Sequence, residues 1–104
     1  MATWRKKLVA HMKAHGESFA DVIALAAAPG SQWHEPGDED YLPPVTIEGD
    51  AWLDIEFDDG YGVAEGCWFT VWTAKRVYFP TEYDGAEGVR SAPRDPCDEA
   101  MRHV

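Results

Sequence analysis

Two β-strand patterns separated by only two residues constrain the fold of this chain more than any other feature. The runs CWFTVWT, residues 67–73, and RVYFP, residues 76–80, are rich in aromatic and β-branched side chains, which favour strands. Because only Ala74 and Lys75 separate them, an antiparallel hairpin is the natural connection. Pro80 has no backbone N–H to donate, so we expect it to end the second strand or to place that strand at a sheet edge.

Two further strands are expected, one before and one after this hairpin. Leu53, Ile55 and Phe57 alternate with polar residues, which predicts a half-buried strand over residues 51–58. The run GVRSA, residues 88–92, follows a turn pattern and is expected to return as a short strand. The sheet is therefore predicted to be an antiparallel meander of three or four strands.

The N-terminus carries a clear helix pattern. Trp4, Leu8 and Met12 recur at four-residue spacing and predict one apolar helix face. Thr3 is suited to cap the start of this helix, and Gly16 is suited to end it in a left-handed conformation. We expect the apolar face to lie in the core.

A second helix is expected to begin at Ser18. Asp21, three residues later, completes a capping pattern, and Pro29 and Gly30 stop the helix. Its apolar stripe would consist of Phe19, Val22, Ile23 and Ala26. The predicted fold class is α+β, with two N-terminal helices packed on a three- or four-stranded antiparallel sheet, in a single domain spanning residues 1–104.

Length and apolar runs bound the class of protein. A chain of 104 residues is large enough to bury a core of its own. No run approaches the roughly 20 apolar residues that a membrane span needs, and charges interrupt the N-terminal segment too early for a secretory signal. We therefore expect a cytoplasmic protein. Cys67 and Cys97 are then expected to be reduced, although the sequence leaves a disulfide between them open.

Charge is segregated along the chain. The 19 Asp and Glu against 9 Lys and Arg give a net charge of −10, and residues 14–74 contain no Lys or Arg at all. Because affinity for nucleic acid and anionic membranes comes from Lys and Arg, we expect the protein to bind neither directly. The second predicted helix also lacks the side chains that read bases, which excludes a helix-turn-helix. Arg5, Lys6 and Lys7 oppose the dipole of the first helix, so we expect the acidic middle of the chain to hold them there.

Motifs for catalysis, for a metal and for a cofactor are lacking. His11 and His15 have the i, i+4 spacing of a zinc-binding pair, but Met12 stands where the protease pattern needs a general-base Glu. Four other potential ligands lack paired spacing: Cys67, Cys97, His34 and His103. The glycine run DGYGVAEG lacks the Lys and Ser or Thr of a phosphate-binding loop. We predict no catalytic residue, no metal and no cofactor.

The acidic face of the strand predicted at residues 51–58 is the main candidate for a binding site. On a strand, Asp54, Glu56 and Asp58 would point the same way at intervals of about 6.6–7 Å, comparable to neighbouring phosphates on nucleic acid. The same pattern also suits the wet face of an ordinary amphipathic strand. A long loop rich in Pro and Gly is expected at residues 29–51. Trp68 and Trp72 either lie under this loop or form a patch that a partner contacts. The predicted partner-binding residues are Asp38, Glu39, Asp40, Asp54, Glu56, Asp58, Asp59, Trp68 and Trp72.

The run GDEDYLPPVTIEGDAWLDIEFDDG, together with a basic first helix and an aromatic-rich meander, supports one resemblance by composition. The chain resembles small phage or mobile-element proteins that disable bacterial defence, including anti-CRISPR proteins and other DNA mimics. The resemblance implies an inhibitor in the host cytoplasm that engages a basic protein partner, a nucleic-acid-handling defence complex. Two alternatives stay open: an accessory interaction or virion module without an inhibitory role, and a small enzyme.

Overall fold

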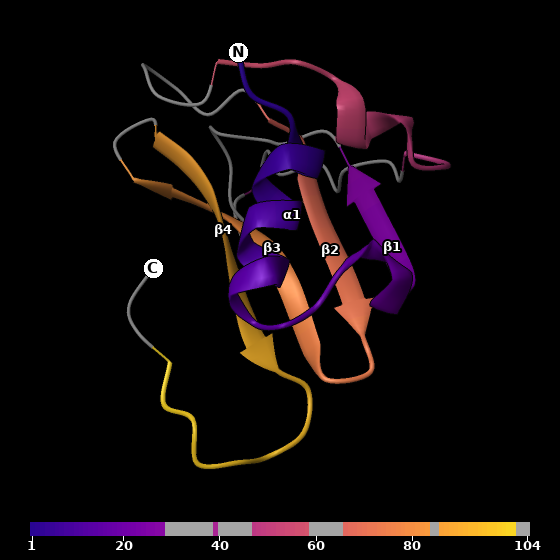
Figure 1. Cartoon of the computed structure of the whole chain (residues 1–104). Helices are drawn as coiled ribbons and strands as arrows, with labels where there is room; N and C mark the ends of the chain where they lie inside the picture. Colours follow the sequence, from indigo (N-terminus) through magenta and orange to yellow (C-terminus); the bar gives the residue numbers. More distant parts are fainter. Residues whose placement is uncertain (29–38, 40–46, 59–65, 84–85, 102–104) are drawn as a thin grey trace.

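The computed structural model describes residues 1–28, 39, 47–58, 66–83 and 86–101. Within these residues an antiparallel sheet in the order β1-β2-β3-β4 is covered on one face by the helix α1 (Figure 1). The strands are β1 (Val22–Ala28), β2 (Trp68–Thr73), β3 (Arg76–Tyr83) and β4 (Ala86–Pro93). The helical elements are α1 (Trp4–Ala14) and two short 3-10 helices, η1 (Phe19–Asp21) and η2 (Ala51–Asp54).

Helix α1 has the start, end and buried face that the sequence predicts. The Thr3 hydroxyl accepts a hydrogen bond from the Lys6 backbone N–H at 3.2 Å. Gly16 follows the helix with φ 71°, the left-handed conformation in which glycine is unstrained. The predicted stripe of Trp4, Leu8 and Met12 is buried against the sheet. The first predicted helix is thus confirmed.

The second predicted helix is wrong, although its capping pattern is real. The Ser18 hydroxyl accepts from the backbone N–H of Ala20 at 3.3 Å, and the Ser18 N–H donates to the Asp21 carboxylate at 2.9 Å. This capping box begins only η1, of three residues, and the chain continues as β1. Across the described residues the protein is α+β with one α-helix on a four-stranded sheet, not two.

Pairing with β2 explains why an alanine-rich segment becomes a strand. Ala24 lies opposite Trp72 and Ala28 lies opposite Trp68, so small side chains adjoin the two largest of the neighbouring strand. Helix propensity distinguishes residues by less than about 1 kcal/mol each, and a full ladder of cross-strand contacts outweighs it. Ile23 was expected on the buried face of the second helix but is 63% exposed.

The predicted hairpin is confirmed. Thr73 is fully buried, and its hydroxyl accepts from the backbone N–H groups of Lys75 at 3.2 Å and Arg76 at 2.9 Å. These two bonds hold the turn between β2 and β3. The strand predicted at residues 88–92 is also confirmed, within the longer β4.

Pro80 neither ends β3 nor lies in an edge strand. β3 is an inner strand of the sheet, and Pro80 lies in the middle of it. However, the register between β2 and β3 covers only residues 71–72 and 77–78, whereas Pro80 pairs with Val89 of β4. The missing N–H therefore falls outside the residues through which β3 pairs with β2.

The strand predicted at residues 51–58 is wrong. Trp52 and Leu53 are adjacent and both buried, at 2% and 1% exposure, which the alternating faces of a strand forbid and a helical turn allows. Ile55, expected inside, is 63% exposed. The residues form η2 followed by an isolated bridge at Phe57, and the strand that completes the sheet is β1 instead.

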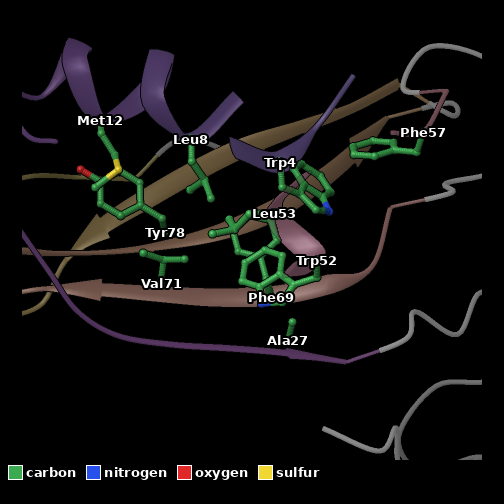
Figure 2. Packing of buried hydrophobic residues seen from close by; sticks show 10 residues of the cluster. All are labelled: Trp4, Leu8, Met12, Ala27, Trp52, Leu53, Phe57, Phe69, Val71 and Tyr78. Atoms are coloured by element: carbon green, nitrogen blue, oxygen red, sulfur yellow. The ribbon is translucent and has the colours of Figure 1, made fainter. Parts of the chain in front are cut away.

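The core gathers aromatic side chains from α1, η2 and β2 on the helix side of the sheet (Figure 2). The Trp4 ring lies 4.8 Å from the ring centroids of both Phe57 and Phe69, and the Trp52 ring stacks on Phe69 at 5.5 Å. The ten buried core residues are Trp4, Leu8, Met12, Ala27, Trp52, Leu53, Phe57, Phe69, Val71 and Tyr78.

Candidate functional site

Residues 47–58, called here the acidic segment, are fixed to the fold at both ends. The Ile47 N–H donates to the Ala27 carbonyl at 2.7 Å, which joins the start of the segment to β1. Near its other end, Phe57 exchanges two backbone hydrogen bonds with Ala2, each 2.9 Å long.

The middle of the acidic segment is held by burial. The Trp52 and Leu53 side chains enter the core, and the Trp52 indole N–H donates to the Gly49 carbonyl at 3.1 Å. Gly49 has φ 76°, so the turn before η2 uses a conformation that favours glycine. The carboxylates of the segment are therefore carried by an ordered backbone.

One carboxylate of the acidic segment pairs with α1. The Arg5 guanidinium donates to both oxygens of Asp54, at 2.7 and 3.1 Å, and lies over the Phe19 ring at 5.2 Å. These hydrogen bonds lower the pKa of the Asp54 carboxyl. For Arg5, the expectation that the acidic middle of the chain holds the basic first turn is confirmed.

The carboxylates of the acidic segment are exposed but do not form a straight row. Asp54 ends η2, and Glu56 and Asp58 flank the buried Phe57 outside any strand. The regular spacing of a strand face is therefore wrong for these three residues. The exposed carboxylates of the acidic segment are Glu48, Asp50, Asp54, Glu56 and Asp58.

Four further acidic residues were predicted to bind the partner. Glu39 is described and exposed. Asp38, Asp40 and Asp59 lie outside the described residues.

The two predicted tryptophans lie on the other side of the sheet. Phe69, Val71 and Thr73 are buried on the α1 side of β2, so alternation places Trp68 and Trp72 on the opposite face, where both are partly buried. The acidic segment packs on the α1 side. The predicted site therefore divides between two faces, and one flat contact would not include both groups.

The described residues that were weighed as metal ligands do not form a metal site. The His11 and His15 rings lie 4.9 Å apart, but among the residues that the structure describes no three His, Cys, Asp or Glu are grouped as a metal site requires. Cys67 and Cys97 are free thiols, and burial raises the pKa of Cys67. His34 and His103 fall outside the described ranges.

A polar cluster at the C-terminal end of α1 was missed by sequence reasoning. The Glu17 carboxylate accepts hydrogen bonds from the Tyr78 hydroxyl at 2.5 Å and from the Thr73 hydroxyl at 3.2 Å. Burial, followed by the hydrogen bond to Glu17, raises the pKa of Tyr78. These contacts join residues 56 and 61 positions apart, so no local pattern announces them.

Comparison of the chain with protein-family models, with curated proteins and with solved structures gave no match. No helix within the described ranges is long and apolar enough to cross a membrane.

Proposed function

We propose that the protein is an acidic inhibitor that binds a basic protein partner on the surface where that partner holds nucleic acid. The observation that carries this proposal is the acidic segment, with five exposed carboxylates on a backbone fixed at both ends and in the middle. Because the segment is ordered before binding, little conformational entropy is lost when it docks.

Electrostatics favour a basic partner of this kind. The five carboxylates of the segment are exposed, and residues 14–74 contain no Lys or Arg. Such a surface speeds association with a basic groove at low salt, and the effect weakens as salt screens it. The compositional resemblance to anti-defence proteins supports a nucleic-acid-handling defence complex as the partner and the host cytoplasm as the place of action. The proposal involves no catalytic step.

The test is affinity capture from a bacterial lysate with the wild-type chain and a double variant, Glu48→Gln with Glu56→Gln. These substitutions remove two exposed charges from the acidic segment and leave the Asp54 pair with Arg5 in place. We expect the wild type to retain nucleic-acid-binding proteins, to release them when duplex DNA is added, and to lose them as salt rises. The double variant should retain less.

A matched control is Asp95→Asn with Asp98→Asn, which removes two exposed charges beyond β4. It should capture as the wild type does. If both double variants lose the partner equally, net charge alone acts and the acidic segment is not the site. If DNA fails to displace the captured partner, the inhibitory mechanism is wrong and a non-inhibitory interaction module is favoured.

A further inference from the structure

A cavity of about 210 Å³ lies at the C-terminal end of α1, between that helix, β3 and β4, and the segment that follows β4. It is far larger than one water molecule needs, and it is smaller than the roughly 300–1,000 Å³ of pockets for drug-sized ligands. Its polar lining consists of His11, His15, Arg76, Arg90, Ser91 and Glu99.

Ser91 is the most buried polar group of this lining, at 4% exposure. Its hydroxyl oxygen accepts from Arg76 Nε at 3.0 Å and lies 3.1 Å from His11 Nε2 and 3.5 Å from His15 Nε2. Because a guanidinium can only donate, the hydroxyl proton is left to point toward an imidazole. The arrangement presents an arginine, a hydroxyl and two imidazoles around one point.

Arg76 already binds one anionic group, the Glu99 carboxylate. Its two terminal nitrogens donate to the two oxygens of Glu99, at 3.1 and 2.9 Å. The Arg76 side chain is 12% exposed, whereas that of Glu99 is 39% exposed and comes from outside the sheet. Ion pairs with one exposed partner are weak, so a stronger anion would displace this carboxylate at small cost.

The lining is positive in a chain whose net charge is −10. With both imidazoles neutral, two arginines and one glutamate leave one positive charge, and with both protonated they leave three. Burial lowers the pKa of His11, and the positive charges of His15, Arg76 and Arg90 lower it further. An anion in the cavity would offset these last three effects.

We propose that this cavity binds the phosphate group of a small molecule, and that Glu99 occupies the arginine when phosphate is absent. A phosphate has enough oxygens to accept from the guanidinium, the serine hydroxyl and an imidazole together, whereas a carboxylate has two. The inference does not depend on the proposed inhibition, because the acidic segment lies beside the N-terminal end of α1 (Figure 1). The cavity is lined by His11 and His15, which lie toward the other end of the helix.

Binding should depend on pH through His11. The charged and titratable groups that face His11 are His15 on its own helix, Arg76 and Tyr78 on β3, Arg90 on β4, and Glu99, which reaches it through Arg76. Cations outnumber anions among them, so the pKa of His11 lies below the ordinary histidine value of 6.5 and a bound anion raises it. Binding therefore tightens as the pH falls below about 6.5. Sulfate stays a dianion across this range and isolates the histidine contribution from the titration of phosphate itself.

The experiment is a titration of the full chain with inorganic phosphate at constant ionic strength, followed by the imidazole resonances in NMR spectra. Histidine-to-glutamine variants assign these resonances. We expect saturable shifts at His11 and His15, and tighter binding of sulfate at lower pH. Ribose 5-phosphate forms a second arm: tighter binding than inorganic phosphate assigns the site to phosphate esters, and equal binding assigns it to free phosphate.

Three variants separate a built site from general charge. Glu99→Gln removes the competing carboxylate and should tighten phosphate binding up to about fivefold. Arg90→Gln should weaken it by at least about tenfold, the lower end of the range for a lost charge-assisted hydrogen bond. Lys13→Gln removes one exposed charge from α1, the helix of His11, at a position outside the cavity lining, and should leave binding unchanged.

Two results would overturn the proposal. One is the absence of any saturable shift at His11 and His15 in the wild type and in Glu99→Gln. The other is equal weakening by Lys13→Gln and Arg90→Gln, which would show that phosphate responds only to the overall charge of the protein.

Discussion

Gly66 is the position where a single methyl group should damage this fold most clearly. A Cβ atom there would lie 2.6 and 2.8 Å from two ring carbons of Trp4 and 2.9 Å from a carboxylate oxygen of Glu87. Trp4 has little room to move, because it is 1% exposed, donates to the Cys67 carbonyl at 3.1 Å and packs against two other aromatic rings. Glu87 is 7% exposed and accepts from the Gly66 N–H at 2.8 Å.

The expected cost of Gly66→Ala follows from these two contacts. Forcing an extra carbon into a packed core costs about 1–3 kcal/mol. Weakening a hydrogen bond to a charged group costs about 1.5–3 kcal/mol, and the two losses overlap because the same shift produces both. We therefore expect a loss of about 2–4 kcal/mol, which lowers the melting temperature of a domain of this size by at least about 8 °C. Urea denaturation and thermal unfolding measure both quantities.

Gly88→Ala is the matched control. The nearest atom to a Cβ at Gly88 is the Thr81 hydroxyl oxygen at 3.5 Å, an ordinary contact, and neither glycine has a left-handed φ. This variant should be neutral or more stable by about 0.4–1 kcal/mol, because alanine restricts the unfolded chain. In a Trp4→Leu background Gly66→Ala should cost at least about 1 kcal/mol less than in the wild type. Equal melting temperatures for the two alanine variants would refute the steric argument.

Two further predictions concern hydrogen bonds at either end of α1. Thr3→Ala removes the cap that accepts from Lys6 and should lower the free energy of unfolding by about 1 kcal/mol, whereas Thr3→Ser should keep most of it; equal urea midpoints for the two variants would contradict this. Tyr78→Phe removes the donor to Glu17 and should cost about 1–2 kcal/mol at neutral pH. Because the pKa of Tyr78 is raised above its ordinary value of 10.0, wild-type stability is intact below pH 10.0 and falls as the pH rises above it. The phenylalanine variant should lose less over that rise, and an identical alkaline loss would show that Tyr78 does not contribute.

Local patterns predicted the parts of the fold that are locally determined. Thr3, the four-residue stripe of α1 and Gly16 act within a few positions of one another, so propensity and capping are sufficient. The β2–β3 hairpin likewise depends on a two-residue connection. These elements were predicted with the right type and nearly the right bounds.

Elements that depend on distant partners were not predictable in this way. Ser18 and Asp21 form the expected capping box, yet Val22–Ala28 become a strand because β2, at least 40 positions later, pairs with them. The period of two at residues 51–58 was misleading, because Trp52 and Leu53 both reach the same core through a helical turn. The exposure of Asp54, Glu56 and Asp58 was therefore predictable from the sequence, but their regular spacing on a strand face was not.

The histidine pair of α1 shows why spacing alone does not reveal what a site binds. His11 and His15 have a spacing that suits a zinc ion, and the sequence argued against zinc because Met12 stands where the protease pattern needs a Glu and no third ligand is specified. Pairing of β3 with β4 places Tyr78 opposite Ser91. The Arg76 side chain also reaches Ser91, whose hydroxyl lies near both imidazoles. Arginines repel a metal cation and attract an anion, so the residues that the sheet places beside the histidines favour an anionic ligand over a metal ion. The net charge of −10 does not reveal this positively charged lining, because most of the acidic residues lie in other parts of the chain.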